Sequence, residues 1–262
     1  MKISGRKIDH LVYCVPDLDA AIDYFKKSIG VEAVVGGQHL LKGTKNALIN
    51  LGHLCYLEIL AADDSIQNIE RPRWMGIDLL EGPKITRWAI KSERIETEIS
   101  EIKKYNPKLG QIKKGERQLP AGDILKWQLS EPAPLPEVEI MPFLIDWSQS
   151  SNHPTLGLKQ EAELLSIALS HSTPKDIEIA VNNIFQIYNR IYLRNKNRIR
   201  AFVNDFCQTI STSTGEYSCG ISLNLGFNSI TAEATLNNNY DADGLTALDL
   251  AIIQRHILGI QL

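Results

Sequence analysis

The stretch IDHLVYCVPDLDAAIDYFKKSIGVEAVVGGQHLLKGTKNALINLGHLCYLEILAA, residues 8–62, decides the fold. Its first eight residues, 8–15, are rich in β-branched and aromatic side chains and stop before a proline, which is typical of a strand. Asp17 can then cap a helix, because apolar residues recur after it at spacings of three and four. Gly30 follows the last of them and predicts the end of that helix.

The rest of this stretch predicts three more strands. Residues 31–35 are a plausible strand directly after the helix. Residues 46–51 and 54–60 are apolar runs separated only by a Gly-His pair, which predicts a hairpin. The stretch therefore has the expected order β-α-β-β-β.

A strand followed by a helix begins near residues 8, 85 and 164, which indicates an internal repeat with a period of roughly 80 residues. We therefore expect an α+β protein. The expected units are a first βαβββ module over residues 1–62, a second over 83–148, a partial third over 160–204, and a Ser/Asn/Gly-rich segment with an amphipathic C-terminal helix over 205–262.

The composition narrows the classes of function. A net charge of −3, with no Lys/Arg stripe among aromatics, is not the pattern of a nucleic-acid binder. No apolar run approaches the length of roughly 20 residues that spans a bilayer, and the first residues show no apolar signal segment. We therefore expect a cytoplasmic protein that binds neither nucleic acid nor membrane. Cys14 and Cys55 alternate with apolar residues, which predicts buried thiols.

Two polar residues stand in the middle of apolar strands of the same module. Glu58 shares one strand face with Tyr56 and Leu60, and His10 shares a face with Ile8 and Val12. A buried carboxylate is costly unless it is paired or bound to a metal. An imidazole and a carboxylate that face each other form half of a site for Zn, Fe, Mn or Ni. The alternative is a core histidine hydrogen-bonded to its glutamate partner.

The segment GGQHLLKGTKNALINLG, residues 36–52, carries three further polar candidates. Its glycines permit a tight backbone around His39, Thr44 and Asn46. Such a loop beside the hairpin can line the mouth of a pocket, or it can be an ordinary connection.

Taken together, these motifs resemble the glyoxalase-like domain of the vicinal-oxygen-chelate superfamily. The motifs are DH-x-V in the first strand, PDLDAA at the helix start, GG-x-H-x-x-x-GT-x-NAL and LG-x-x-x-YLEI, and MPFLIDWSQSSNHP later in the chain. The resemblance covers residues from about 7 to 203 and implies that paired βαβββ modules form a cupped, barrel-like sheet around a ligand.

The resemblance also implies a divalent metal, held by a His or Gln on the first strand and a Glu on the last strand of each module. His10 and Glu58 match the pair of the first module. The second module departs from the pattern, since it places Arg87 or Trp88 at the His position and Ile145 or Asp146 at the Glu position. His39 is the most plausible substitute ligand.

The last 22 residues, DADGLTALDLAIIQRHILGIQL, predict a loop followed by an amphipathic helix. With the tyrosine before them they resemble half of a dockerin-like repeat, whose aspartates bind calcium, although the loop is one residue short. A terminal ankyrin repeat is a rival match, and a helix that docks on the body of the protein is the third alternative.

Two functions remain open at this point. The first is a glyoxalase-like enzyme, a metal-dependent lyase, isomerase or dioxygenase that acts on a small oxygen-rich molecule, with Glu58 and His39 as catalytic residues. The second is a metal-free protein that sequesters a small molecule in the same cup. In either case the expected ligand-binding residues are Thr44, Asn46, Tyr56 and Trp88. The expected assembly is a homodimer.

Overall fold

The computed structural model describes residues 7–103, 109–150, 152–160, 162–171, 191–195, 218–222 and 229–236. Within these ranges no helix is both long enough and apolar enough to cross a membrane. The helices of the described part are α1 (Leu18–Ile29), the 3-10 helix η1 (Trp74–Leu79) and α2 (Ile95–Ile102). Eight strands form the main sheet: β1 (Ile8–Cys14), β2 (Val34–His39), β3 (Thr44–Asn50), β4 (Tyr56–Ala62), β5 (Lys84–Lys91), β6 (Ile112–Gln118), β7 (Ile124–Ser130) and β8 (Phe143–Asp146).

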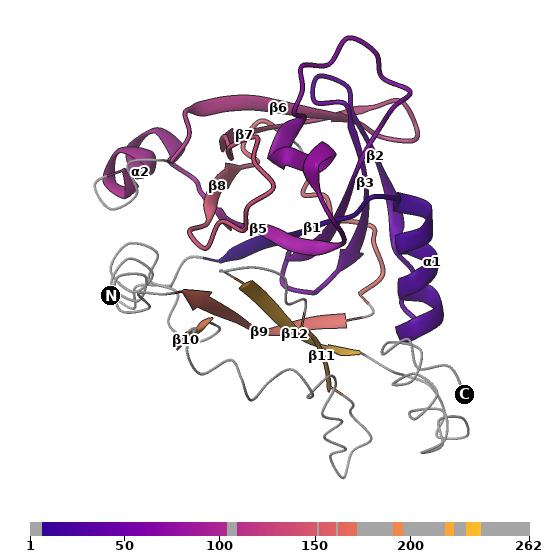
Figure 1. Cartoon of the computed structure of the whole chain (residues 1–262). Coiled ribbons are helices and arrows are strands. Elements are labelled where there is room, and N and C mark those ends of the chain that lie inside the picture. The colour runs from indigo at the N-terminus through magenta and orange to yellow at the C-terminus, as the bar shows by residue number, and fades with distance from the viewer. Residues whose placement is uncertain are drawn as a thin grey trace, which may run out of the picture.

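These eight strands close into a barrel in the order β1-β4-β3-β2-β6-β7-β8-β5 (Figure 1). The first four strands and α1 have the order β-α-β-β-β, and the next four strands and α2 repeat it. In each half the first strand pairs in parallel with the last, β1 with β4 and β5 with β8. The expected α+β fold with a cupped sheet built from tandem βαβββ modules is thereby confirmed.

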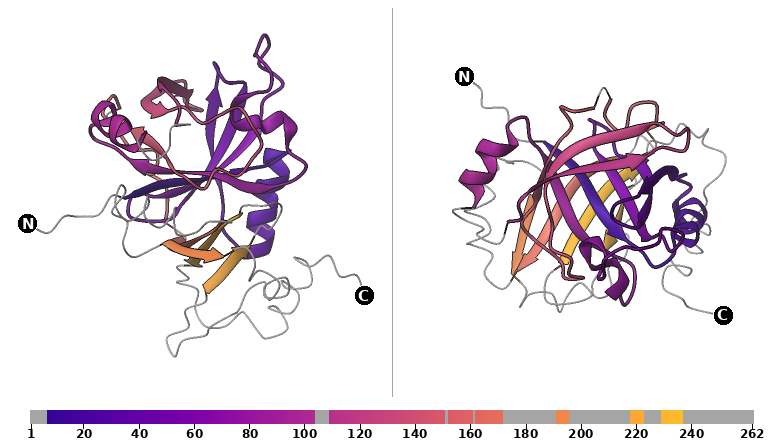
Figure 2. Two further views of the ribbon diagram at one scale, coloured as in Figure 1. Left: turned by 60° about the vertical axis from the view of Figure 1, so that its left-hand side comes forward. Right: turned by 90° about the horizontal axis from the view of Figure 1, so that it is seen from above.

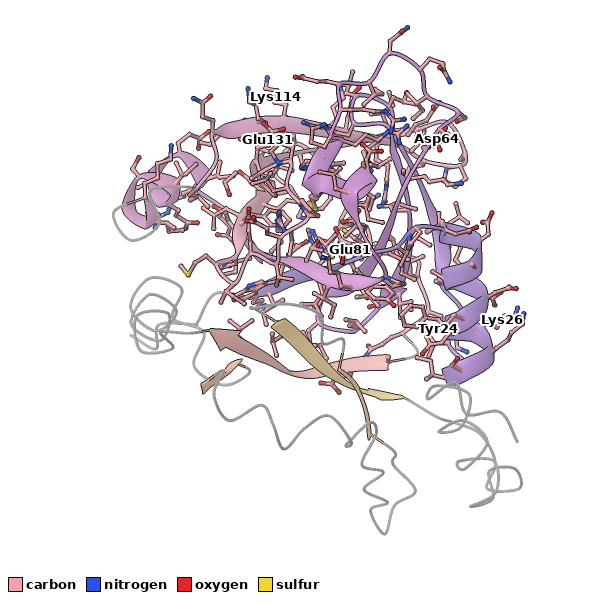
Figure 3. All side chains as sticks on the ribbon, viewed as in Figure 1. Tyr24, Lys26, Asp64, Glu81, Lys114 and Glu131 are labelled. Atoms are coloured by element: carbon pink, nitrogen blue, oxygen red, sulfur yellow. The ribbon has the colours of Figure 1, made fainter. Side chains whose placement is uncertain are left out.

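Helix α1 begins and ends at the residues that the sequence predicts. The Asp17 side chain accepts a hydrogen bond from the Ala20 amide at 3.0 Å, and Gly30 takes the left-handed conformation with φ 69°. Phe25 is buried between the helix and the sheet, whereas Lys26 projects from the outer side of the helix (Figure 3). The helix therefore covers the outside of the barrel through one apolar stripe.

Alternation along β1 and β4 divides their side chains between two cores. Val12, Cys14 and Leu60 pack inside the barrel, and Leu11 and Ile59 pack on its outer face. Both strands are apolar on both faces because α1 and a second sheet cover the outside. Cys14 and Cys55 are buried, as predicted.

Two strand predictions need correction, and one strand was not predicted. The strand expected at residues 31–35 runs over Val34–His39, so His39 lies in a strand and not in a loop. Glycine is depleted in strands, but here Gly36 and Gly37 sit at a bulge that neighbouring residues approach closely. Strand β6 was not predicted because IKKGERQ is almost entirely polar. The apolar residues of 138–145 predict one more strand, and it is shorter in the structure, Phe143–Asp146.

The remaining described strands form a second sheet that packs against the outside of the barrel (Figure 2). Its order is β10-β9-β12-β11, with β9 (Ala162–His171), β10 (Ile191–Asn195), β11 (Ser218–Ser222) and β12 (Ser229–Leu236). Leu164 and Ile167 of β9 join the outer core of the barrel. The sequence Thr-Pro-Lys-Asp at residues 173–176 predicts the start of the helix of the third module. This helix and the C-terminal tail over residues 240–262 lie outside the described residues. The proposed domain boundaries stay a prediction.

Replacing Gly37 with alanine is expected to lower the free energy of unfolding by about 2–3 kcal/mol, because the new methyl group has no room. A Cβ at this position would lie 1.9 Å from the Gln118 carbonyl oxygen, and the backbone has φ +134°. The contact lies where β2 meets β6, which is one of the two seams between the modules. Urea unfolding measures the change.

Gly82→Ala is the matched control, since no atom lies within 4 Å of the Cβ it would add. It should change stability by less than about 0.5 kcal/mol. Equal effects of the two substitutions would show that the seam is not closely packed at Gly37.

Candidate functional site

The barrel encloses a small cavity to which both modules and η1 contribute. The first module supplies the polar wall: His10, His39, Asn46, Tyr56 and Glu58. The second module supplies a mostly apolar wall: Arg117, Trp127, Leu129, Phe143, Ile145 and Trp147. Trp74 of η1 completes the lining. The cavity therefore places a cluster of titratable groups opposite a set of aromatic rings.

Glu58, on β4, is the centre of the polar wall. Its side chain is buried, with Oε2 3.8 Å from His10 Nε2 and Oε1 3.8 Å from His39 Nε2. Asn46 on the neighbouring strand β3 donates from Nδ2 to Glu58 Oε1 at 2.6 Å. The structure thus brings together four of the six first-module residues that the sequence singled out: His10, His39, Asn46 and Glu58. It does so because β1, β4, β3 and β2 are consecutive in the sheet and these positions share the inner face.

A buried carboxylate, Asp9, orients the ring of His10. Asp9 Oδ1 lies 2.6 Å from His10 Nδ1, and Oδ2 accepts from Trp147 Nε1 at 3.1 Å and lies 3.2 Å from His153 Nε2. Burial raises the pKa of Asp9, but the hydrogen bonds with His10 and His153 outweigh it and lower that pKa to about 2. An ionised Asp9 can only accept, so His10 carries its hydrogen on Nδ1 and turns Nε2 toward the cavity.

Aromatic neighbours hold the two imidazoles in place. The Tyr56 ring stacks on His10 with centroids 4.7 Å apart, and Phe143 meets the same ring edge-on at 5.4 Å. His39 lies between Trp74 and Trp127, with centroid distances of 5.7 and 5.8 Å. Both rings are therefore fixed by packing as well as by hydrogen bonds.

Thr44 contacts His39 and does not line the cavity. Its Oγ1 lies 2.9 Å from His39 Nδ1, and the threonine is fully buried. Burial lowers the pKa of His39 to about 4, although the nearby Glu58 raises it, so the imidazole is neutral at pH 7. Thr44 is thus placed to orient a neutral His39.

Trp88, expected to bind ligand, lies away from the cavity. It is fully buried in the outer core, and its Nε1 donates to the Ile140 carbonyl at 2.7 Å. Arg87 also points elsewhere, since its guanidinium donates to the Leu135 carbonyl at 2.9 Å and pairs with Glu139 at 3.2 Å. Their positions do not support a part in ligand binding.

The sequence reasoning missed Asp9, Arg117 and His153. Asp9 immediately precedes His10 in an apolar strand, and a charge at such a place is a signal that it has a buried partner. Arg117 lies in the unpredicted strand β6. His153 belongs to the HP pair of the later motif, but nothing in the sequence brings it next to Asp9.

The residues at the cavity fit a metal ion incompletely. His10 Nε2, His39 Nε2 and the Glu58 carboxylate face one another, but no group of three or more His, Cys, Asp or Glu in the described part has the arrangement of a metal site. The described part of the second module adds no metal ligand at the positions that the resemblance implied. Ile145 lines the cavity, and Asp146, on the other face of β8, accepts a hydrogen bond from the Ser148 amide. We therefore derive no reaction step through a metal.

The low pKa of His39 makes stability depend on pH in a defined window. Between pH 6.5 and 4 the unfolded chain binds a proton at this residue that the folded protein excludes, so stability falls as the pH falls through that range. Between pH 7 and pH 5 this proton binding lowers the free energy of unfolding by about 2 kcal/mol. Urea unfolding at the two pH values measures this. The free energy of unfolding of His39→Gln should fall by about 2 kcal/mol less than that of the wild type over this interval.

His53→Gln is the control for this measurement, because His53 has a side chain that is 66% exposed and lies outside the cavity. Its stability should follow the pH in the same way as that of the wild type. An identical pH dependence of His39→Gln and the wild type would mean that His39 is not held neutral.

Comparisons with known proteins agree with this architecture. Residues 8–183 match the model of a family described as glyoxalase-like domain. A hypothetical protein from Staphylococcus aureus has a similar structure, with a TM-score of 0.53 and 17% identity over 72% of this chain and 85% of that one. This likeness concerns the fold alone.

Smaller structures match less well. A methylmalonyl-CoA epimerase from Streptomyces coelicolor in complex with 2-nitronate-propionyl-CoA gives a TM-score of 0.37 and 15% identity, over 55% of this chain and 99% of that one. A hypothetical protein from Bacillus halodurans gives 0.37 and 17%, over 55% and 94%. The chain matches no curated protein. Since the family model spans more than half of the sequence, the chain belongs to the glyoxalase-like domain family.

Proposed function

We propose that the cavity is the site of an enzyme that moves a proton on a small oxygen-rich molecule, in an isomerase- or lyase-type reaction. The observation that carries this proposal is the convergence of two imidazole Nε2 atoms on the buried carboxylate of Glu58, each at 3.8 Å. Side chains that exchange protons with a substrate converge in this way at active sites, because each of them must come within hydrogen-bond distance of the reacting atoms.

Glu58 is the proposed base. Asn46 occupies its Oε1, which leaves Oε2 for the reactant. The carboxylate would take a proton from a carbon next to a carbonyl group, and the C–H electron pair would form a C=C bond while the carbonyl oxygen becomes an oxyanion. Return of a proton to the opposite face of the carbon, as the C=O bond re-forms, completes an isomerisation. Departure of a leaving group from the neighbouring carbon with its bonding electrons, as the C=O bond re-forms, completes an elimination.

His10 and His39 are proposed to have different parts. His10 is held by Asp9 in the manner of a base with its orienting carboxylate, so it can carry a proton to or from the reacting molecule and be stabilised when it is charged. His39 is neutral and lies beside Glu58, where a neutral Nε2–H can donate to the oxyanion.

The experiment that tests this proposal is hydrogen exchange in D₂O, followed by proton NMR. Small 2-oxo acids and 1,3-dicarbonyl compounds would be incubated with the protein, with and without a chelator. At least one compound should lose the signal of its hydrogens next to the carbonyl group at a rate proportional to protein concentration. If folded protein exchanges none of them above the buffer rate, the enzyme proposal is wrong.

A binding protein without catalysis is the second candidate. The aromatic rings of the second-module wall, which we call the aromatic wall, favour a binding protein. Trp127, Phe143 and Trp147 offer rings on which a ligand can stack, on the side where the resemblance implied metal ligands. A compound that binds tightly in the cavity and shows no exchange would assign this function.

A divalent metal, Zn, Fe, Mn or Ni, at His10 and Glu58 stays a prediction of the resemblance. Elemental analysis of protein purified without added metal tests it: one metal per chain, lost in Glu58→Gln, would support it, and a trace amount would not. A cytoplasmic location and a homodimer likewise stay predictions.

A further inference from the structure

Arg117 brings a positive charge into the cavity from the second module. It lies on β6, is 4% exposed, and lines the cavity with the first-module residues. Burial lowers the pKa of Arg117, but a guanidinium keeps its proton in proteins. The side chain is therefore a buried cation.

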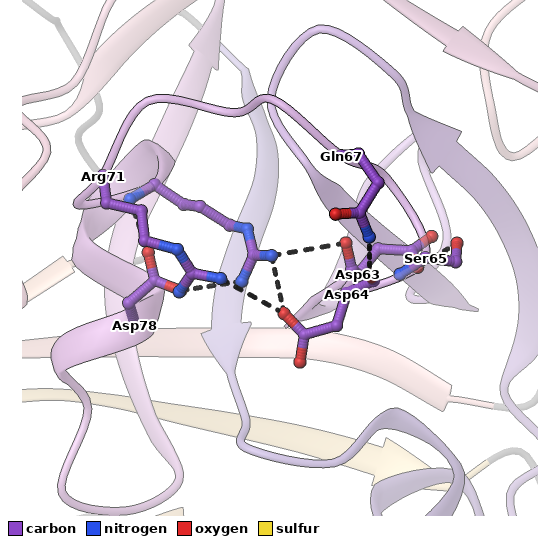
Figure 4. A network of polar contacts seen from close by, with 7 residues as sticks. Asp63, Asp64, Ser65, Gln67, Arg71 and Asp78 are labelled. Carbon is purple, nitrogen blue, oxygen red and sulfur yellow. Dashed lines mark hydrogen bonds and ion pairs between the residues drawn. The ribbon is translucent and has the colours of Figure 1, made fainter.

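The other two buried arginines of the described part have carboxylate partners. Arg73 pairs with Asp64 at 2.6 Å and with Asp78 at 2.7 Å, in the network shown in Figure 4. Arg87 pairs with Glu139 at 3.2 Å. Arg117 differs: among the described residues no carboxylate oxygen lies within 4.0 Å of it, and its Nη1 donates to the neutral Asn46 Oδ1 at 3.2 Å.

Asn46 keeps the two charges of the cavity apart. Its Oδ1 accepts from Arg117 and its Nδ2 donates to Glu58, so the amide bridges the cation and the anion. Glu58 therefore balances the charge of Arg117 without touching it. A buried charge with no counter-ion in direct contact is costly, and such a cost is retained where function needs the charge. Arg117 therefore has the capacity to bind an anion directly.

Two tryptophans at the cavity have indole N–H groups that donate to no acceptor in the described part of the chain. Trp74 Nε1 and Trp127 Nε1 are buried, and among the described residues neither has a hydrogen-bond partner. Both residues line the cavity. Buried N–H groups are nearly always satisfied in folded proteins, so their occurrence here favours a ligand that carries acceptor oxygens.

We infer that the molecule bound in this cavity carries a carboxylate, which Arg117 holds by charge-assisted hydrogen bonds while Glu58 faces the carbon next to it. The planar guanidinium presents two N–H groups in the spacing of a carboxylate, which a lysine does not. The inference rests on the proposal that the cavity is the reaction site, and it names the class of substrate: a small oxo or dicarbonyl carboxylic acid.

Paired probes separate this inference from the proposed function. Pyruvate and 2-oxobutyrate would be compared with their methyl esters in the D₂O exchange assay, and malonate with malonamide by titration calorimetry. Each neutral partner keeps the carbonyl groups of the acid but lacks its charge, and malonamide also keeps the size of malonate. The wild type should exchange or bind the acid at least tenfold better than its neutral partner.

Arg117→Met keeps an unbranched apolar stem and removes the charge, and it should reduce the preference for acid over neutral probe by about 10- to 100-fold. Arg117→Lys, which restores a charge without the planar fork, should recover only part of it. Lys42→Met is the matched control. Lys42 lies 6.0 Å from the Trp74 ring, but Glu131 already pairs with it, so the preference should stay unchanged.

The outcomes are distinct. Equal exchange of acids and esters by the wild type would keep the enzyme and overturn the carboxylate inference. Malonate binding that depends on Arg117, without exchange of any probe, would keep the inference and overturn the enzyme. Malonate that binds no better than malonamide overturns the inference, and this comparison needs only the wild-type protein, even if the Arg117 variants do not fold.

Discussion

Glu58→Gln is expected to slow the exchange of hydrogen into the substrate by about 10²- to 10⁴-fold, the usual contribution of a general base. Glutamine keeps the size of the side chain and an oxygen for Asn46 Nδ2, which donates to Glu58 Oε1 at 2.6 Å. It cannot accept a proton at pH 7. Binding of the same probe should change only a few-fold, because Arg117 and the aromatic wall remain.

Glu98→Gln is the control, since Glu98 is also buried but lies on α2 and contacts Ser92 Oγ at 2.6 Å, outside the cavity. Its exchange rate should match that of the wild type. If Glu58→Gln keeps more than a tenth of the wild-type exchange rate with unchanged binding, Glu58 is not the base.

Asp9→Asn is expected to lower the free energy of unfolding by about 1.5–3 kcal/mol, the contribution of hydrogen bonds to a buried charged group. His10, His153 and Trp147 all direct nitrogen atoms at the two oxygens of this carboxylate, which is fully buried. An amide has one oxygen, so in either orientation its NH₂ group faces a donor.

Asp17→Asn makes the same chemical change at an exposed helix cap, where asparagine caps as well as aspartate. It should alter stability by less than about 0.5 kcal/mol. Urea unfolding at pH 7 compares the two variants. A loss under about 1 kcal/mol for Asp9→Asn would mean that the network around His10 does not depend on the charge.

The sequence predicted the first module well because its signals are local. A cap at Asp17, a stop at Gly30 and a Gly-His turn fix α1 and the hairpin without reference to the rest of the chain. Strand β6 was missed because its polar residues carry no periodic signal. It is ordered by ladder hydrogen bonds to β7, and Trp127 lies over Gly115 in that pair.

The site was predictable only in part, because only some of its residues carry a local signal in the sequence. His10 and Glu58 stood out as polar residues within apolar strands, and the barrel brings them together. The prediction that Trp88 binds ligand depended on an alignment of the two modules that was uncertain by one residue. A shift by one residue turns a strand side chain to the opposite face of the sheet. Arg117 reaches Asn46 across the seam between modules, which no local pattern shows.

The central claim is that His10, His39 and Glu58 surround one ligand. Long-range proton–nitrogen NMR of protein with ¹⁵N-labelled histidine, titrated with malonate, tests it most directly. The Nε2 resonances of His10 and His39, assigned by their absence in His10→Gln and His39→Gln, should shift together with a single dissociation constant. Those of the exposed His53 should stay in place. Binding of malonate that moves neither cavity imidazole would place the ligand elsewhere and contradict the claim.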